Sequence, residues 1–110
     1  ADPANLAAVR RGLLGVVRNG TGRRAALYDV DVAGKTGTSQ VVSLEKEKAG
    51  KSIRRFQNHA WFVAYAPAED PQVAVSVIVE HGGQGGEVAA PLARRFLAKY
   101  FANANLARER

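Results

Sequence analysis

Residues 32–42, VAGKTGTSQVV, place a Lys-Thr-Gly-Thr tetrad inside an apolar segment that is rich in β-branched residues. Such a segment predicts a β-strand, over about residues 31–43. Alternation along a strand sends Lys35 to one face and Thr36 to the other. Both side chains can therefore serve one site only if this strand lies at the edge of a sheet, where backbone N–H groups stay unpaired.

The tetrad offers the groups that hold a carboxylate-bearing substrate. Lys35 carries a positive charge, and Thr36 and Thr38 carry hydroxyls. Gly37 allows a substrate or a neighbouring helix to approach the backbone closely. The backbone N–H of Thr38 is a candidate donor to a developing oxyanion, a contact worth about 3–4 kcal/mol in acyl transfer. These residues form one half of an active site, because the 110 residues contain no convincing nucleophilic serine with its lysine.

The remaining pattern predicts a mixed α/β (α+β) fold in the order helix, three antiparallel strands, helix. The expected helices cover residues 5–20 and 87–101, and the expected strands cover 31–43, 58–66 and 72–80. Asn5 is the candidate N-cap of the first helix. The second helix repeats apolar residues at helical spacing, namely Val88, Leu92, Phe96 and Tyr100. The polar tail from residue 103 to residue 110 is expected to fray.

The last two strands are nearly continuous in apolar residues, which indicates burial on both faces of the sheet. Two helices cover only one face of a three-stranded sheet, so the second face would stay bare. We therefore expect the chain to be a piece of a larger domain.

Composition excludes several classes of protein. The chain has no cysteine, which rules out disulfides, thiolate metal sites and a cysteine nucleophile. It has no apolar run long enough to span a membrane and no visible signal peptide. The net charge of +6 comes from scattered basic pairs without an aromatic-rich RNA-binding signature, so we expect solvated surface and no nucleic-acid partner. We expect no metal or cofactor; His59 and His81 lack a partner cluster and are assigned structural roles.

Three other interpretations of short motifs compete. Residues 34–36, Gly-Lys-Thr, match the end of a phosphate-binding P-loop, but Asp29 stands where that pattern needs glycine and no helix follows. Residues 43–46, Ser-Leu-Glu-Lys, fit S-x-x-K, yet they lie in a charged segment without a helix to align serine and lysine. Residues 81–86, His-Gly-Gly-Gln-Gly-Gly, are either a phosphate-cradling loop or a plain strand-to-helix connector near the site, and we favour the connector.

Lys-Thr-Gly is also the last of three motifs that mark serine β-lactamases and penicillin-binding proteins, the others being S-x-x-K and S-x-N. Flanking segments extend this similarity at matching spacing: residues 19–22 (NGTG), 59–67 (HAWFVAYAP), 71–75 (PQVAV), 79–83 (VEHGG) and 89–91 (AAP). Over residues 5–102 the chain resembles the C-terminal part of the transpeptidase domain of a class B penicillin-binding protein, of the elongation type.

The resemblance implies a partial β-lactamase/transpeptidase-like fold and a serine-type D,D-transpeptidase. Such an enzyme cross-links peptidoglycan stem peptides through an acyl-enzyme, and β-lactams trap its serine. By position, Lys35 would supply charge and hydrogen bonding near the nucleophile, and Thr36, Gly37 and Thr38 would bind the carboxylate of the substrate or antibiotic. The N–H of Thr38 would form half of the oxyanion hole.

The chain departs from the family pattern because it has no S-x-N motif and no credible S-x-x-K. We therefore expect the chain alone to be inactive and its missing upstream part to be its main partner. The exposed outer edge of the last strand is expected to promote a homodimer. The resemblance implies a parent on the periplasmic face of the inner membrane, anchored by an N-terminal helix. Two alternatives remain at this point: a non-catalytic basic binding module and a fragment of a serine β-lactamase.

Overall fold

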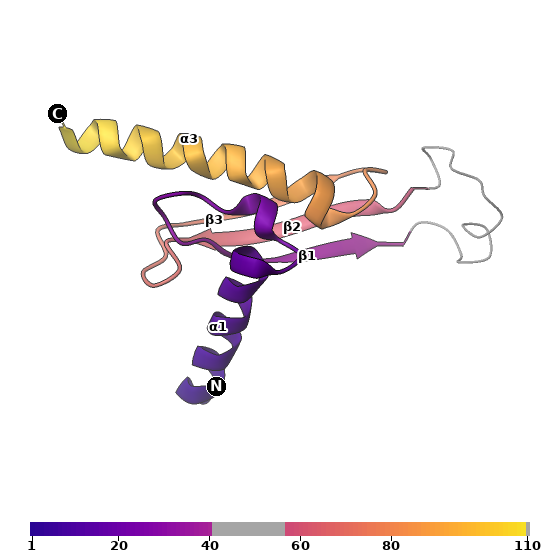
Figure 1. Cartoon of the computed structure of the whole chain (residues 1–110), viewed down its shortest axis with the longest axis horizontal. Helices are drawn as coiled ribbons and strands as arrows, with labels where there is room; N and C mark the ends of the chain where they lie inside the picture. Colours follow the sequence, from indigo (N-terminus) through magenta and orange to yellow (C-terminus); the bar gives the residue numbers. More distant parts are fainter. Residues whose placement is uncertain (41–56, 110) are drawn as a thin grey trace.

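Within residues 1–40 and 57–109, two α-helices and a three-stranded antiparallel sheet follow one another in the order that the sequence predicts (Figure 1). The computed structural model describes residues 1–40 and 57–109. The strands are β1 (Ala33–Ser39), β2 (His59–Ala66) and β3 (Val73–Val79). The prediction of a mixed α/β chain with three antiparallel strands is therefore confirmed. The last residues of the first predicted strand, and the S-x-x-K match at 43–46, lie outside the described residues.

Helix α1 (Pro3–Asn19) begins two residues before the predicted start. The predicted N-cap Asn5 is wrong, because the side chain of Asp2 caps the helix by accepting a hydrogen bond from the Ala4 N–H at 2.8 Å. Pro3 follows at the first helical position, where its missing N–H costs nothing. The helix ends where the N–H groups of Gly20 and Gly22 both donate to the carbonyl of Val16.

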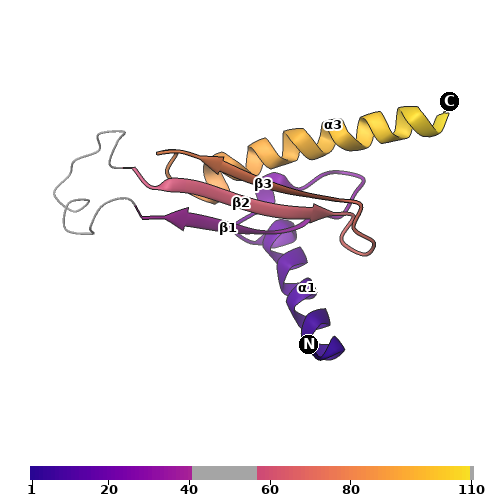
Figure 2. The ribbon, with the colours of Figure 1, turned by 180° about the vertical axis from the view of Figure 1, so that it is seen from behind.

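Strand β2 lies in the middle of the sheet, with β1 and β3 on its two sides (Figure 2). In the register of the sheet Thr36 is opposite Phe62, and Phe62 is opposite Val77. Because side chains of directly opposed residues share a face, Thr36, Phe62 and Val77 lie on one face, which we call the inner face. Lys35, Val63 and Ser76 share the other face, which we call the outer face.

The core lies between the inner face and helix α3 (Ala90–Glu109). A π-helical turn, η3 (Gly85–Ala89), leads directly into α3. The helix thus starts near the predicted position but continues to Glu109, so the expected fraying of the tail from residue 103 is wrong for the described residues.

The buried side of α3 is not the side that carries the predicted apolar repeat with Leu92 and Phe96. Leu92 and Phe96 are 42% and 50% exposed. The buried stripe lies one residue further along the helix, and consists of Ala89, Ala93, Leu97 and Phe101. The inner face already carries Phe62 and the valines of β3, so small alanines on the facing helix allow the close approach that dense packing requires.

The outer face is bare over much of its area. Helix α1 reaches it through Leu13 and leaves Val63 and Ile78 exposed by 46% and 47%. Strand β3 alternates between half-buried and exposed residues. Burial of β3 on both faces, as its continuous apolar sequence predicted, is therefore wrong in the part of the chain that the structure describes, whereas the expected bare face is present.

Across residues 1–40 and 57–109, the helices lack the combination of length and apolar character that crossing a membrane requires.

The opposite environments of two adjacent residues give a test of this packing. Phe62 is fully buried on the inner face and Val63 is about half exposed on the outer face. Phe62→Ala is expected to lower the free energy of unfolding by about 3–5 kcal/mol, because it leaves a cavity under α3. Val63→Ala is the control and should cost about 1 kcal/mol or less. Urea denaturation followed by the fluorescence of Trp61 measures both, and equal costs would contradict the assignment of faces.

Candidate active site

The Lys-Thr-Gly-Thr tetrad lies within β1, which pairs on one side with β2 and has no strand on its other side in the described part of the chain. The strand continues through Ser39, so residues 34–36 do not lead into a helix and the P-loop interpretation is wrong. Strand β1 therefore lies at the edge of the sheet, which is the condition under which Lys35 and Thr36 can contribute to one site.

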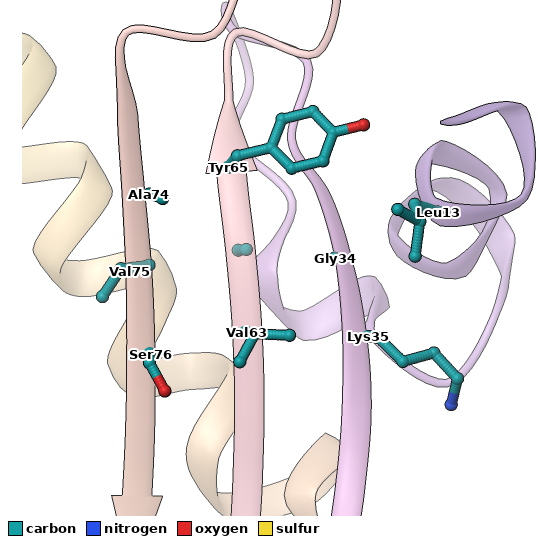
Figure 3. Close-up of a pocket in the computed structure, with 9 residues that line it drawn as sticks. Leu13, Gly34, Lys35, Val63, Tyr65, Ala74, Val75 and Ser76 are labelled. Carbon is teal, nitrogen blue, oxygen red and sulfur yellow. The ribbon is translucent and has the colours of Figure 1, made fainter. Parts of the chain in front are cut away.

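Lys35 lies on the outer face, and its side chain extends along the free edge of β1, away from β2 (Figure 3). Its Nζ atom donates to the carbonyl oxygen of Thr36 at 3.1 Å. That carbonyl therefore points to the free edge. Residues two apart on an antiparallel strand direct their backbone groups to the same side, so the N–H of Thr38 points to the free edge as well.

Thr36 and Thr38 lie on the inner face and line a polar pocket of about 410 Å³. The hydroxyl of Thr36 lies 3.1 Å from the hydroxyl of Thr21, in the turn after α1. The other lining residues come from this turn, from η1 (Arg23–Ala25) and from the start of η3: Asn19, Gly20, Arg23, Arg24, Gln84, Gly85, Gly86 and Glu87. We call this cavity the threonine pocket.

Two arginines give the threonine pocket positive charge. Arg23 and Arg24 both line it, and Nη1 of Arg24 donates to the backbone carbonyl of Glu87 at 3.3 Å. From the sequence alone these arginines are scattered surface charge, and Thr21 has no role. The sequence feature that could have indicated these pocket residues is the turn at residues 19–22, because it ends one helix immediately before a basic pair. Two arginines against the one carboxylate of Glu87 leave the pocket net positive, which favours an anionic group there.

The glycine-rich connector after β3 forms one wall of the threonine pocket. Gly85 lies against the backbone of β1 and β2, where an added Cβ would collide with the carbonyl oxygens of Trp61 and Gly37. An added Cβ on Gly86 would collide with the carbonyl oxygen of Thr21. The connector can therefore lie this close to the tetrad only because these positions carry no side chain.

A second cavity, of about 370 Å³, opens on the outer face (Figure 3). It lies between Leu13 of α1 and the strands, and Lys35, Val63, Tyr65 and Ser76 line it. The hydroxyl of Tyr65 and the Nε1 atom of Trp61, both on this face of β2, are buried without a hydrogen-bond partner among the described residues. The tetrad thus separates a polar cavity on the inner side from a mostly apolar cavity on the outer side.

Among residues 1–40 and 57–109, side chains of histidine, cysteine, aspartate and glutamate form no group of three or more that could hold a metal ion. His59 and His81, which the sequence left apart, do lie together, with ring centroids 4.6 Å apart.

Comparison with known proteins gives consistent matches. Residues 2–98 match the penicillin binding protein transpeptidase domain. The chain is 46% identical over 99 residues to the peptidoglycan D,D-transpeptidase MrdA of Haemophilus influenzae, covering 84% of this chain and 15% of that protein. Its structure resembles that of Pseudomonas aeruginosa PBP2 in complex with WCK 5153, with a TM-score of 0.71 and 38% identity over 90% of this chain and 19% of that one. It also resembles the imipenem acyl-enzyme complex of penicillin-binding protein A from M. tuberculosis, with a TM-score of 0.68 and 29% identity over 92% of this chain and 20% of that one.

The close approach of the connector can be tested with two glycines. Gly85→Ala is expected to destabilise the fold by about 1–3 kcal/mol, because the new methyl group has no space and the backbone must shift. Gly12→Ala is the matched control: it lies in α1 with nothing within 4 Å of its added Cβ, and should stabilise the chain by about 1 kcal/mol through helix propensity. Urea denaturation measures both, and a neutral Gly85→Ala would contradict the packing of the connector on β1.

Proposed function

The chain belongs to the penicillin-binding protein transpeptidase family, and we propose that it forms the Lys-Thr-Gly-Thr wall of a peptidoglycan D,D-transpeptidase active site. It spans about 15% of the length of the Haemophilus influenzae relative. As the family resemblance implies, the nucleophile and the rest of the site would come from an upstream part of the same domain.

The placement of the tetrad on a free strand edge carries this proposal. Lys35 lies on the outer side of that edge, and Thr36 and Thr38 lie on the inner side beside two arginines. A ligand that docks along the edge meets a cation on one side, hydroxyls on the other and an unpaired N–H between them. This set suits a peptide that ends in a carboxylate and has a carbonyl to be attacked.

Each group of the tetrad has a role in acyl transfer. The upstream serine attacks the carbonyl carbon of the penultimate D-alanine of a stem peptide, and the N–H of Thr38 donates to the oxyanion that develops. The bond to the terminal D-alanine then breaks, and that residue leaves with a proton. The amine of a second stem peptide displaces the serine and forms the cross-link. A β-lactam follows the first half of this sequence and stays on the serine.

The hydroxyls of Thr36 and Thr38 hold the carboxylate of the stem peptide or of the antibiotic, and the charges of Arg23 and Arg24 favour that anion from the threonine pocket. Lys35 places its charge on the outer side, where the upstream serine approaches. Gly37, between the two threonines, keeps the backbone open to the ligand.

The outer face supports the idea that the upstream part of the same domain packs on this chain. Val63 and Ile78 are half exposed there, and the buried Trp61 Nε1 and Tyr65 hydroxyl have no partner in the described residues. Burying this apolar face and pairing the two polar atoms would both be favourable. A segment that packs there also lies beside Lys35, which lines the outer cavity. The assembled enzyme would act on the periplasmic face of the inner membrane, where its substrate is.

Acylation by a fluorescent penicillin tests this function. The 110-residue chain alone is expected to remain unlabelled, whereas the parent domain that contains it should form a covalent adduct. Lys35→Ala in the parent domain should slow labelling by about 100-fold or more, which is the range for loss of one group that stabilises transition-state charge. Thr38→Val should slow it by about tenfold, because a hydrogen bond to the carboxylate is lost.

Lys99→Ala is the matched control, since it removes the same charge from an exposed position on α3. Unchanged labelling of the Lys35→Ala variant would contradict the proposal. Salt-dependent retention of the chain on nucleic acid or anionic vesicles, together with a parent domain that is never labelled, would favour the basic binding module instead.

The isolated chain can self-associate through the outer edge of β3. This edge has no strand beside it in the described part of the chain, and unpaired edges template pairing with a second copy. We expect a concentration-dependent homodimer by light scattering, weakened by Ile78→Lys because a charge beside the edge disfavours strand pairing. A monodisperse monomer at high concentration would contradict this expectation.

A further inference from the structure

A pair of histidines ties the glycine-rich connector to the start of β2. His59 is the first residue of β2, and His81 follows the end of β3 by two residues. Their rings meet edge to face, with centroids 4.6 Å apart and an interplanar angle of 60°. The backbone N–H of His81 donates to the Nδ1 atom of His59 at 2.9 Å, in a partly buried setting.

The connector begins in a conformation that needs such support. His81 has φ of 53°, in the left-handed region that residues with a Cβ rarely adopt. Two more hydrogen bonds hold it there: Nδ1 of His81 lies 3.1 Å from the carbonyl oxygen of Gln57, and the N–H of Gly83 donates to the carbonyl of Asn58 at 2.9 Å. The residues just before β2, and its first side chain, therefore fix the direction in which the connector leaves β3.

The protonation of both rings follows from their partners. A backbone N–H can only donate, so Nδ1 of His59 is the acceptor in this contact. A carbonyl can only accept, so Nδ1 of His81 carries a proton. The two histidines thus have different tasks, and only His59 offers an acceptor to the connector.

The position of the connector matters to the tetrad. Four residues after His81, Gly85 lies directly on the backbone of Gly37, and Gly86 lies against Thr21, whose hydroxyl is near that of Thr36. A connector that leaves β3 in another direction would move this wall of the threonine pocket.

We propose that His59 is a positioning residue: by accepting the N–H of His81 it holds the connector against the tetrad and so shapes the threonine pocket. The effect on substrate rests on the function proposed above, whereas the effect on the connector is a property of this chain alone. His59 itself touches no reacting atom.

Three substitutions of His59 separate the role of its hydrogen-bond acceptor from that of the bulk of its ring. In His59→Asn the side-chain oxygen lies near the position of Nδ1 and can accept the same N–H, whereas in His59→Gln it lies one bond further out. His59→Leu removes the acceptor. Amide hydrogen exchange of the 110-residue chain reads out the contact at His81, and the exchange of the Phe62 amide in the core reports any change in global stability.

The N–H of His81 is expected to exchange about tenfold faster in the Leu and Gln variants and to stay close to wild type in the Asn variant, with Phe62 little changed. The amide resonances of Gly37 and Thr38 should shift in the Leu variant and not in the Asn variant. Equal protection of His81 in all variants would overturn the proposal, as would an Asn variant that behaves like Leu. If the Leu variant does not fold, the comparison of the Asn and Gln variants tests whether the acceptor at residue 59 holds the N–H of His81.

Acylation of the parent domain by a fluorescent penicillin gives the functional outcome. His59→Gln should slow labelling by about tenfold relative to His59→Asn. Unchanged labelling despite a loosened connector would overturn the positioning role. If even the wild-type domain is not labelled, the proposed function fails, while the exchange and resonance data on the chain still decide whether His59 orders the connector.

Discussion

The free edge of β1 is the constraint on which the rest of the structure depends. A strand alternates its side chains between two faces, so Lys35 and the two threonines lie on opposite sides of the sheet. They can act on one ligand only where both sides are reachable, which is at an edge without a neighbouring strand. The same edge exposes the N–H of Thr38. The chemistry follows from where the strand lies as much as from which residues it carries.

The two faces of the sheet differ in how completely their side chains are buried. On the inner side, Phe62, Ala90 and Ala93 pack without exposed surface, and the connector rests on bare backbone at Gly37. One wall of the threonine pocket therefore rests on closely packed backbone at Gly85, as precise positioning of a ligand requires. On the outer side Val63 and Ile78 stay half exposed. Under the proposed function, the part of the site that this chain completes by itself is the carboxylate side, and the side of the nucleophile is left open to another segment.

Local sequence predicted the strands and their order, because β-branched runs and short turns specify these directly. The edge position of the tetrad was expected only as the condition under which Lys35 and Thr36 serve one site. Local sequence did not predict the features that depend on tertiary packing. The large residues Leu92 and Phe96 suggested the buried stripe of α3, but the crowded sheet favours the alanines. Contacts between residues far apart in the chain produce no pattern in the local sequence. Examples are the contacts of Thr21 with Thr36 and of His59 with His81. Asp2 caps the first helix in place of Asn5, and Pro3 after it suits the first helical position.

Hydrogen exchange along β1 tests the central claim most directly. If the outer edge is free, the N–H of Thr38 exchanges with solvent far faster than the N–H of Gly37, which faces β2. The residues alternate in this way only at a strand edge that is open on one side. Equal, strong protection of both amides would mean that the edge is covered by another strand. The tetrad would then have no backbone donor to offer, and its assignment as an active-site wall would be contradicted.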